Sequence, residues 1–340
     1  MAASLPKFQQ EFATNQKKDL PIKLTKEECN GKTYIVTGAT GGLGFECVKH
    51  LVALDAAKVI IAVRSQESGN TTKTTIETET GRQDVIDVWS LDLASYDSVK
   101  AFAKKTEELD RIDAIVLNAG ALMATWEEKE GAESNITINF FSNFLLTFLI
   151  FPHLEAIAKK HDIKPRVVVV GSMGAFVTEP CVKMMVKPDT LEDLNNREKW
   201  ESQQELRYAF SKLLEHFAVR EMASHLPVSQ TGIILNVVDP GLCKTNLTRN
   251  TSFFTSIKTW LIKALLGRTA EMGSRTLLHG ISEGEESHGK YLTSCDIRED
   301  HIPEFVTNED GKAWQVQVWA ELLEKLEQIQ PGCVAAVIKN

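Results

Sequence analysis

The sequence predicts an α/β fold in which a mainly parallel β-sheet is covered by helices on both faces. Short runs rich in Val and Ile alternate along the chain with longer segments whose apolar residues recur at spacings of three and four. The short runs are continuously apolar, which is typical of strands buried on both faces, and parallel strands need crossover connections between them. No repeat, low-complexity tract or Pro/Gly-rich linker marks a domain boundary, so a single domain is expected.

The expected elements follow one another in the order of βαβ units. The predicted strands are Thr33–Thr37, Lys58–Val63, Asp84–Trp89, Ile112–Leu117, Arg166–Val170 and Gly232–Val238, with a weaker one at Lys290–Thr293. The clearest helical patterns are Phe45–Leu54, Ser98–Leu109, Ser134–Ile157 and Gln204–His225. A polar leader (1–30), an insert at 174–203 and everything after position 240 lie outside the simple alternation.

Composition excludes several classes of protein. With 38 Lys+Arg against 46 Asp+Glu, the 340-residue chain carries a net charge of −8, which argues against a nucleic-acid partner. The six cysteines are scattered and no H-E-x-x-H motif occurs, so we expect no metal ion and a reducing compartment. The leader contains no apolar signal segment. The most apolar stretch, Ile138–Phe151, is shorter than the ~20 residues that span a bilayer. A cytoplasmic protein without a transmembrane segment is therefore expected.

A glycine-rich turn directly follows the first predicted strand. The stretch Thr37–Gly44 reads T-G-A-T-G-G-L-G and leads into a helical pattern. A strand that turns sharply into a helix presents free backbone N–H groups to a pyrophosphate, provided that no Cβ atom stands in the way. Glycines at Gly38, Gly42 and Gly44 meet this requirement. The turn predicts a dinucleotide site on a Rossmann-type, doubly wound sheet.

The spacing of these glycines resembles that of the short-chain dehydrogenase/reductase family, and the resemblance extends over roughly residues 31–293. Further motifs occur in the family's order: Asn118-Ala119-Gly120, Asn139, Ser172, Tyr208-x-x-x-Lys212, and Pro240-Gly241 followed by Thr245. Local sequence is similar to the retinol-dehydrogenase-like branch and to filamentous-fungal members. The resemblance implies cofactor contacts at Thr37, Gly38, Thr40, Gly42, Leu43, Gly44, Arg64, Ser65, Asp92, Leu93, Asn118, Ala119, Gly120, Tyr208, Lys212, Pro240, Gly241 and Thr245.

Tyr208 and Lys212 are four residues apart and therefore share one face of the predicted helix. Carbonyl reduction needs an acid that protonates the oxygen, and a nearby ammonium group favours the phenolate of a tyrosine whose pKa is otherwise ~10. Ser172 can donate a hydrogen bond to the substrate oxygen. In the family that the chain resembles, the lysine also holds the nicotinamide ribose, and the asparagine at the place of Asn139 supports a water relay to that lysine.

The end of the second predicted strand bears on the choice of cofactor. NAD sites usually place a carboxylate here, whereas a 2′-phosphate is bound by a guanidinium. The strand ends at Val63, Arg64 and Ser65 follow, and no acidic residue occurs before Glu67. Because Arg64 can pair with the additional phosphate, the sequence predicts NADP(H). Asp239, directly before Pro240, is a departure from relatives and adds a carboxylate near the nicotinamide end.

The sequence thus predicts an NADPH-dependent carbonyl reductase that acts on a mainly apolar small molecule, such as a natural-product intermediate. A non-redox isomerase or cyclase and a non-catalytic NADP(H)-binding protein are alternatives on the same fold. We expect an NADP-binding catalytic domain at 31–295 with a substrate loop at 240–282, and a C-terminal extension with a helix at 296–340. The apolar stretch Phe253–Leu266 has three interpretations: a packed helix, a lid over the substrate and a membrane-surface helix. The chain is expected to be a monomer or homodimer.

Overall fold

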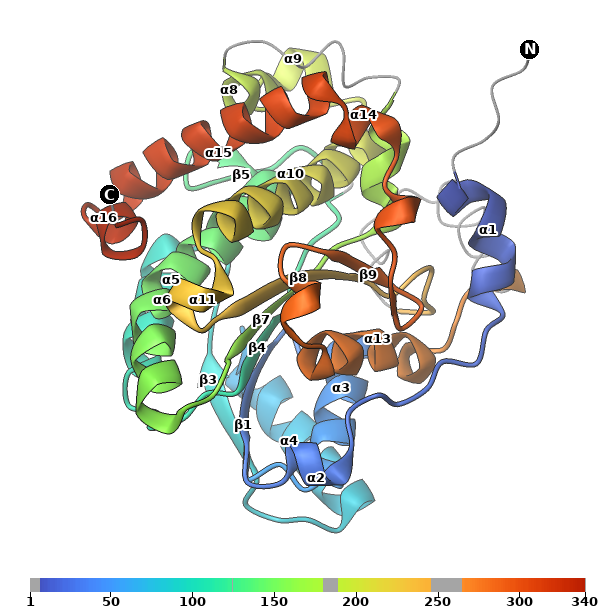
Figure 1. The fold of residues 1–340 in the computed structure, drawn as a ribbon, viewed down its shortest axis with the longest axis vertical. Coiled ribbons are helices and arrows are strands. Elements are labelled where there is room, and N and C mark those ends of the chain that lie inside the picture. The colour runs from blue at the N-terminus through green and yellow to red at the C-terminus, as the bar shows by residue number, and fades with distance from the viewer. Residues whose placement is uncertain (1–6, 124, 180–188, 246–264, 340) are drawn as a thin grey trace.

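An eight-stranded sheet lies at the centre of the protein (Figure 1). The structure is a computed structural model and describes residues 7–123, 125–179, 189–245 and 265–339. Strand order across the sheet is β10-β9-β8-β7-β4-β1-β2-β3, and each neighbouring pair is parallel except β9 with β10. The strands are β1 (Thr33–Thr37), β2 (Lys58–Val63), β3 (Ile86–Ser90), β4 (Ala114–Leu117), β7 (Arg166–Val170), β8 (Ile234–Asp239), β9 (Tyr291–Thr293) and β10 (Asp296–Ile297). The predicted α/β fold with a mainly parallel sheet is confirmed.

Helices cover both faces of the sheet. One face carries α3 (Gly42–Ala53), α4 (Gln66–Thr80) and α13 (Ala270–Ser282), and the other carries α5 (Tyr96–Thr106), α6 (Ser142–His161) and α10 (Gln204–His225). Successive strand residues point to opposite faces, so Tyr34 and Val36 join one apolar core while Ile35 joins the other. The continuous apolar runs in the sequence therefore supply two cores at once.

The strand register brings the carboxyl ends of the central strands to one edge of the sheet. Ile35 of β1 lies opposite Ile60 of β2 and Ile115 of β4, and Ile115 in turn lies opposite Val167 of β7. In doubly wound sheets, ligands bind outside this edge, where the connections to the helices begin. The turns and loops after β1, β2, β3, β4, β7 and β8, which carry most of the predicted site residues, start at this edge.

The most apolar helix lies inside the molecule. It begins with a π-helical segment, η1 (Ile136–Phe141), and continues as α6. The combined helix Ile136–His161 is long and apolar enough to cross a bilayer, but 78% of its most apolar window is buried in the fold. Its apolar character is accounted for by packing between the sheet and the neighbouring helices α5 and α10.

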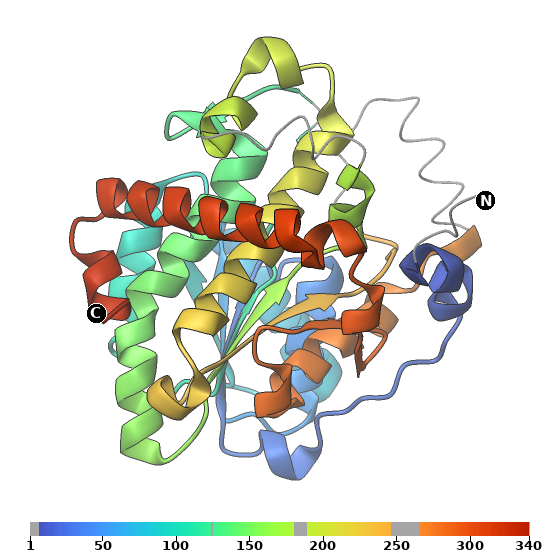
Figure 2. The ribbon, with the colours of Figure 1, turned by 45° about the horizontal axis from the view of Figure 1, so that its top comes forward.

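Several elements were not predicted from periodicity. The leader forms α1 (Lys7–Gln16) and α2 (Lys26–Cys29). By contrast, the helix predicted in the C-terminal extension is present as α15 (Glu309–Ile329), which crosses α10 (Figure 2). The remaining short elements are the β5–β6 hairpin (Glu128–Lys129, Ala132–Glu133), η2 (Met173–Thr178), α8 (Thr190–Leu194), α9 (Arg197–Trp200), α11 (Val228–Thr231), η4 (Glu285–Ser287), η5 (Glu299–His301), α14 (Glu304–Thr307) and α16 (Cys333–Val337). The apolar stretch Phe253–Leu266 lies outside the described residues apart from its last two positions, so its three interpretations stay predictions.

Candidate active site

The glycine turn between β1 and α3 is tightly packed against the end of β4. The Asn118 side chain donates hydrogen bonds to the carbonyl oxygens of Thr37 (2.9 Å) and Gly38 (3.1 Å), and the Ala119 N–H donates to Thr37 Oγ1 (2.9 Å). Gly38 has a φ of +67°, and a Cβ atom there would lie 2.9 Å from Ala119 Cα. At Gly44 a Cβ atom would lie 2.6 Å from both Asn118 Nδ2 and the Gly38 carbonyl oxygen. Both positions therefore require glycine, as the motif predicts.

The first turn of α3 is approached by the loop after β8. Gly42 begins α3 with a φ of +59°, and a Cβ atom at this position would lie 3.2 Å from Cγ2 of Thr245. Thr40 is exposed and Leu43 is half-buried beside it. The Pro240–Thr245 segment thus comes within van der Waals range of the glycine turn, although the two are distant in sequence. Together they border the N-terminus of α3, whose free N–H groups suit a pyrophosphate.

Residues after the second and third strands lie at the same edge of the sheet. Arg64 is exposed and makes no ion pair with another described residue. Ser65 begins the next helix: its hydroxyl accepts a hydrogen bond from the Ser68 N–H at 3.2 Å and caps α4. Asp92 accepts the Ala94 N–H through Oδ1 (3.0 Å), which shapes the loop after β3. The Leu93 carbonyl accepts the Ser142 hydroxyl at 2.6 Å and ties this loop to α6.

Tyr208, Lys212 and Ser172 lie together at the carboxyl edge of the sheet. Ser172 follows β7, and its Oγ accepts a hydrogen bond from the Gly174 N–H at 3.0 Å. The Ser172 hydroxyl also lies close enough to the phenol of Tyr208 on α10 to lower its pKa. One turn further along α10, Lys212 Nζ lies 5.9 Å from the centre of the Tyr208 ring. The three residues that the resemblance assigned to catalysis are thus neighbours in space.

The environment of Tyr208 shifts its pKa upward. Burial has the largest effect and raises the pKa of the phenol above its ordinary value of 10, against the Lys212 ammonium, which lowers it. The carboxylates of Glu215 and Asp239 raise the pKa further, and the Ser172 hydrogen bond lowers it. The sequence anticipated the lowering effect of Lys212. The tertiary structure adds burial and two carboxylates, which outweigh it and keep the phenol protonated.

Lys212 has a buried carboxylate partner that sequence reasoning missed. Its Nζ donates to both carboxylate oxygens of Glu215 (3.0 Å each) and to the carbonyl oxygen of Val170 (2.9 Å). Burial is the largest single effect and lowers the pKa of Lys212, but the charge of Glu215, the nearby Tyr208 and the hydrogen bond to Glu215 together raise this pKa more, so the lysine stays protonated. Burial also raises the pKa of the Glu215 carboxyl. The only signal for this pair in the sequence is a glutamate three residues after the lysine, on the same helical face.

Asn139 lies in the π-helical segment η1 and is fully buried. Its Oδ1 accepts the Ala121 N–H at 2.7 Å, and its Nδ2 donates to the Ala121 carbonyl (2.9 Å) and to Ser211 Oγ (2.8 Å). The side chain therefore joins the loop after Gly120 to α10. In this arrangement Asn139 holds the two segments that carry Lys212 and the end of β4 in fixed relation.

Asp239 is a structural centre at the end of β8. Its Oδ1 accepts the N–H groups of Met173 and Gly241 (3.1 Å each), and its Oδ2 accepts the hydroxyls of Tyr291 (3.1 Å) and Thr293 (3.0 Å). Four donors satisfy the buried carboxylate. This departure from relatives thus has a physical account: the aspartate holds the loop after β7, the Pro-Gly loop and β9 together around the site.

A second buried ion pair supports the catalytic helix. Arg207, the residue before Tyr208, donates to Glu133 across 2.7 Å, and both side chains are almost fully buried. Glu133 also accepts the backbone N–H of Asn135 at 2.8 Å, just before η1 begins. The pair therefore joins the start of α10 to the segment that leads to Asn139. Only the fold reveals this contact, because the two residues are far apart in the chain.

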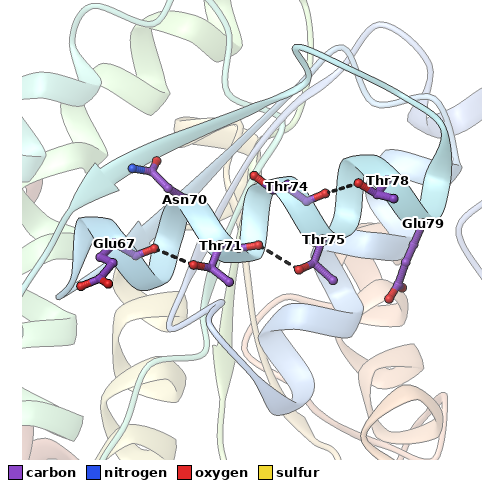
Figure 3. A pocket seen from close by; sticks show the side chains of 7 residues that line it. All are labelled: Glu67, Asn70, Thr71, Thr74, Thr75, Thr78 and Glu79. Carbon is purple, nitrogen blue, oxygen red and sulfur yellow. Dashed lines mark hydrogen bonds between the residues drawn. The ribbon is translucent and has the colours of Figure 1, made fainter.

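A wide, shallow hollow on the outer face of α4 is unrelated to this site (Figure 3). Its lining is polar and includes none of the predicted site residues. The hydroxyl groups of Thr71, Thr75 and Thr78 each donate to the carbonyl oxygen four residues earlier, at 2.8–3.1 Å. These hydroxyls are therefore engaged within the helix, and the chemistry of the molecule lies at the sheet edge instead.

With this geometry established, comparisons with known proteins define the class. A sequence profile described as short chain dehydrogenase matches residues 32–184. The chain is 41% identical over 306 residues to the short chain dehydrogenase/reductase dmxR8 of Cryptosporiopsis sp., covering 89% of this chain and 93% of the relative. It is 38% identical to the short-chain dehydrogenase anuD of Penicillium roqueforti, covering 89% and 79%. The chain belongs to the short-chain dehydrogenase/reductase family, as its motifs predicted.

Solved structures share the fold at low sequence identity. The NADPH-bound carbonyl reductase from chicken fatty liver is 19% identical, with a TM-score of 0.54 over 78% of this chain and 97% of that one. The actinorhodin polyketide ketoreductase with NADPH is 20% identical, with a TM-score of 0.56 over 79% and 96%. The Rossmann-type fold is thereby confirmed. As a member of this family, the protein is an oxidoreductase that uses a nicotinamide dinucleotide and acts on small molecules.

Proposed function

We propose that this protein is an NADPH-dependent carbonyl reductase that converts a ketone or aldehyde to the alcohol, in a reaction that is reversible. One observation carries the proposal: Ser172, Tyr208 and Lys212 form a contiguous polar cluster at the carboxyl edge of the sheet. Each member has the chemistry that carbonyl reduction requires, and the glycine turn borders the same edge.

The residues present fit a dinucleotide phosphate. The turn at Gly38 and Gly44 leaves no space for a Cβ atom, so the backbone N–H groups at the start of α3 stay accessible to a pyrophosphate. Arg64 is exposed at the end of β2 and free of ion pairs with described residues, so its guanidinium is available to a 2′-phosphate. Thr245, Asn118 and Gly120 border the remaining length of the site. These features favour NADPH over NADH.

When bound, NADPH supplies the hydride. Tyr208 supplies the proton: its pKa is raised by burial, so the phenol holds its proton at neutral pH and can donate it to an oxygen that is gaining negative charge. Ser172 Oγ, which already accepts the Gly174 N–H, can donate a hydrogen bond to the same oxygen and so orient the carbonyl, while keeping its own proton. Lys212 keeps its charge because Glu215 faces it, and this charge stabilises the phenolate left on Tyr208.

The substrate is proposed to be mainly apolar. Half-buried Met173, beside Ser172, and the buried ring of Phe176 give the serine apolar surroundings. Relatives with similar sequences come from filamentous fungi, and one structural neighbour is a polyketide ketoreductase, so a natural-product ketone is a reasonable first choice. We propose that the protein is cytoplasmic. Because NADPH is usually kept reduced in the cytoplasm, reduction of the carbonyl compound is the expected direction.

The test is the loss of NADPH absorbance with a panel of ketones and aldehydes. Tyr208→Phe should retain NADPH binding and lose at least about 100-fold in kcat, since it removes only the proton donor. Tyr96→Phe, a buried tyrosine on α5 outside the site, is the matched control and should keep wild-type activity. Turnover by Tyr208→Phe equal to the control would contradict the proposal.

A further inference from the structure

Helix α1 is part of the catalytic half of the molecule, although the sequence marks it only as a polar leader. Phe8 is buried, and its ring lies 5.5 Å from the ring of Phe176 on η2, just beyond Ser172. On the same helix, Glu11 pairs with Arg298 at 2.9 Å and with His301 at 3.2 Å. The helix is thus fixed beside η2 and the loops after β9, as its place in Figures 1 and 2 shows.

The last residue of α1 holds the loop that follows β8. Gln16 is buried; its Oε1 accepts the Leu242 N–H at 3.2 Å, and its Nε2 donates to the carbonyl oxygens of Leu242 (2.8 Å) and Leu266 (3.1 Å). The oxygen and the nitrogen of this amide thus both bond to the backbone at Leu242, and the nitrogen also bonds to the backbone at Leu266. One side chain therefore fixes two strand-like backbone segments at once.

A buried arginine completes the connection. Arg268 donates to the Pro240 carbonyl at 3.1 Å, to Ser294 Oγ at 2.9 Å, and to the carbonyl oxygen of Asn15 at the end of α1. Backbone hydrogen bonds in both directions pair the stretch around Cys243 with Arg268. The Pro-Gly loop is consequently held by two groups: the side chain of Arg268 and the C-terminal end of α1.

Gly241 shows how closely the helix approaches this loop. Its φ is +73°, and a Cβ atom there would lie 2.2 Å from Gln16 Oε1 and 3.1 Å from Arg268 Nη1. The glycine of the Pro-Gly motif is therefore required partly because α1 is present. This explanation links a family motif to a segment outside the predicted catalytic domain.

A small cavity of about 20 Å³ lies between α1 and the catalytic loops. Phe8 and Phe12 of α1 line it on one side, and Met173, Asp239 and Tyr291 line it on the other. Met173 directly follows Ser172, so the cavity adjoins the place where the substrate carbonyl would lie. Aromatic rings and a thioether form the apolar part of its lining, and polar groups, among them the Asp239 carboxylate and the Gln16 amide, form the rest.

From these contacts we propose that α1 is the outer wall of the substrate site and that Gln16 is a positioning residue for the loop Pro240–Thr245. This inference rests on the proposed function, because it assigns the wall of the same site. It predicts that Gln16 affects the binding of substrate and dinucleotide more than the chemical step, and that Phe12 affects which carbonyl compounds fit.

The main variant is Gln16→Glu, which keeps the side-chain size but sets an oxygen against two carbonyl oxygens. Gln9→Glu is its matched control, since Gln9 is exposed on the same helix and the charge change is the same. For Gln16→Glu we expect the KM for the carbonyl compound to rise about tenfold with kcat changed less than about threefold. The Kd for NADPH, measured by its fluorescence, should rise about threefold. A purely structural role would lower the unfolding midpoint and leave these constants unchanged.

Phe12→Ala tests the wall without touching the Gln16 hydrogen bonds. The ratio of kcat/KM for a bulky cyclic ketone to that for a small ketone should rise about fivefold. If the wild type is active and Gln16→Glu has the same KM and NADPH Kd as Gln9→Glu, the inference about α1 is overturned while the proposed function stands. If Gln16→Glu does not fold, an unchanged ratio of kcat/KM for the two ketones in Phe12→Ala would overturn the inference. If none of the tested carbonyl compounds supports NADPH oxidation by the wild type, the proposed function fails. The Kd values of Gln16→Glu and Gln9→Glu for NADPH then still decide the role of Gln16. Absence of NADPH binding to the wild type would overturn both.

Discussion

His216 lies one turn beyond Lys212 on α10 and is held as a neutral group. Its side chain is only 2% exposed, and the rings of Phe176 and Tyr291 lie 5.6 Å and 5.8 Å away in edge-to-face arrangements. Neither ring nitrogen has a hydrogen-bond partner among the described residues. Burial, aided by the charge of Arg220, lowers the pKa of this imidazole to about 3 from its ordinary value of 6.5.

This low pKa makes the free energy of unfolding depend on pH. Below pH 6.5 the unfolded chain binds a proton at His216, whereas the folded protein does not bind it until the pH approaches 3. Acid therefore favours the unfolded state, and between pH 7 and pH 5 this one residue costs about 2 kcal/mol of stability. The contribution of His216 is complete above pH 6.5 and is lost progressively as the pH falls toward 3.

His216→Leu removes the titrating group and keeps an apolar side chain of similar size. We expect the unfolding free energy of His216→Leu, relative to that of the wild type, to rise by about 2 kcal/mol when the pH is lowered from 7 to 5. Urea unfolding followed by circular dichroism at both pH values measures this difference, in which other titrating groups largely cancel. His225→Leu, on the half-exposed side of the same helix, controls for the loss of an imidazole. If the unfolding free energy of His216→Leu relative to the wild type were the same at pH 7 and pH 5, the low pKa of His216 would be refuted.

Two further predictions concern the cofactor site. Arg64→Asp should raise the Kd for NADPH about tenfold or more while changing that for NADH less than about threefold, because we propose that the guanidinium binds only the additional phosphate. Fluorescence titration with both dinucleotides checks this, and an unchanged preference would exclude Arg64 from the phosphate site. Gly44→Ala should lower the free energy of unfolding by about 1–3 kcal/mol and weaken NADPH binding, because the new Cβ atom would lie 2.6 Å from the Gly38 carbonyl oxygen. Urea unfolding measures the first effect and the same titration measures the second. Wild-type values for both would contradict the close packing of the turn.

The predictable parts of the fold follow from local patterns. β1, β2 and β7 have the bounds that their apolar runs indicated, and α10 spans Gln204–His225 as its periodicity predicted. By contrast, α4 was not predicted, because most of its residues are polar and its threonine hydroxyls bond within the helix instead of forming an apolar stripe. The antiparallel β10 was also missed, since a two-residue strand carries no periodicity.

The closeness of the three proposed catalytic residues could be predicted for a related reason. Tyr208 and Lys212 are neighbours on one helix, and Ser172 ends a strand whose apolar run is plain in the sequence. The partners that set their properties were not predictable. The i, i+3 spacing places Glu215 near Lys212, but only the tertiary structure buries both side chains, and Asp239 gains its four donors from three separate segments.

Residue order and short-range spacing were enough to predict the sheet and the glycine turn and to propose the residues of proton transfer, because these depend on contacts within one strand, turn or helix. Tertiary structure alone decided the contact of Gln16 with Leu242, 226 positions away, and the burial that raises the pKa of Tyr208. Such contacts form when distant segments are brought together by packing of the whole core. No local pattern encodes which side chains will meet there or how much water will remain.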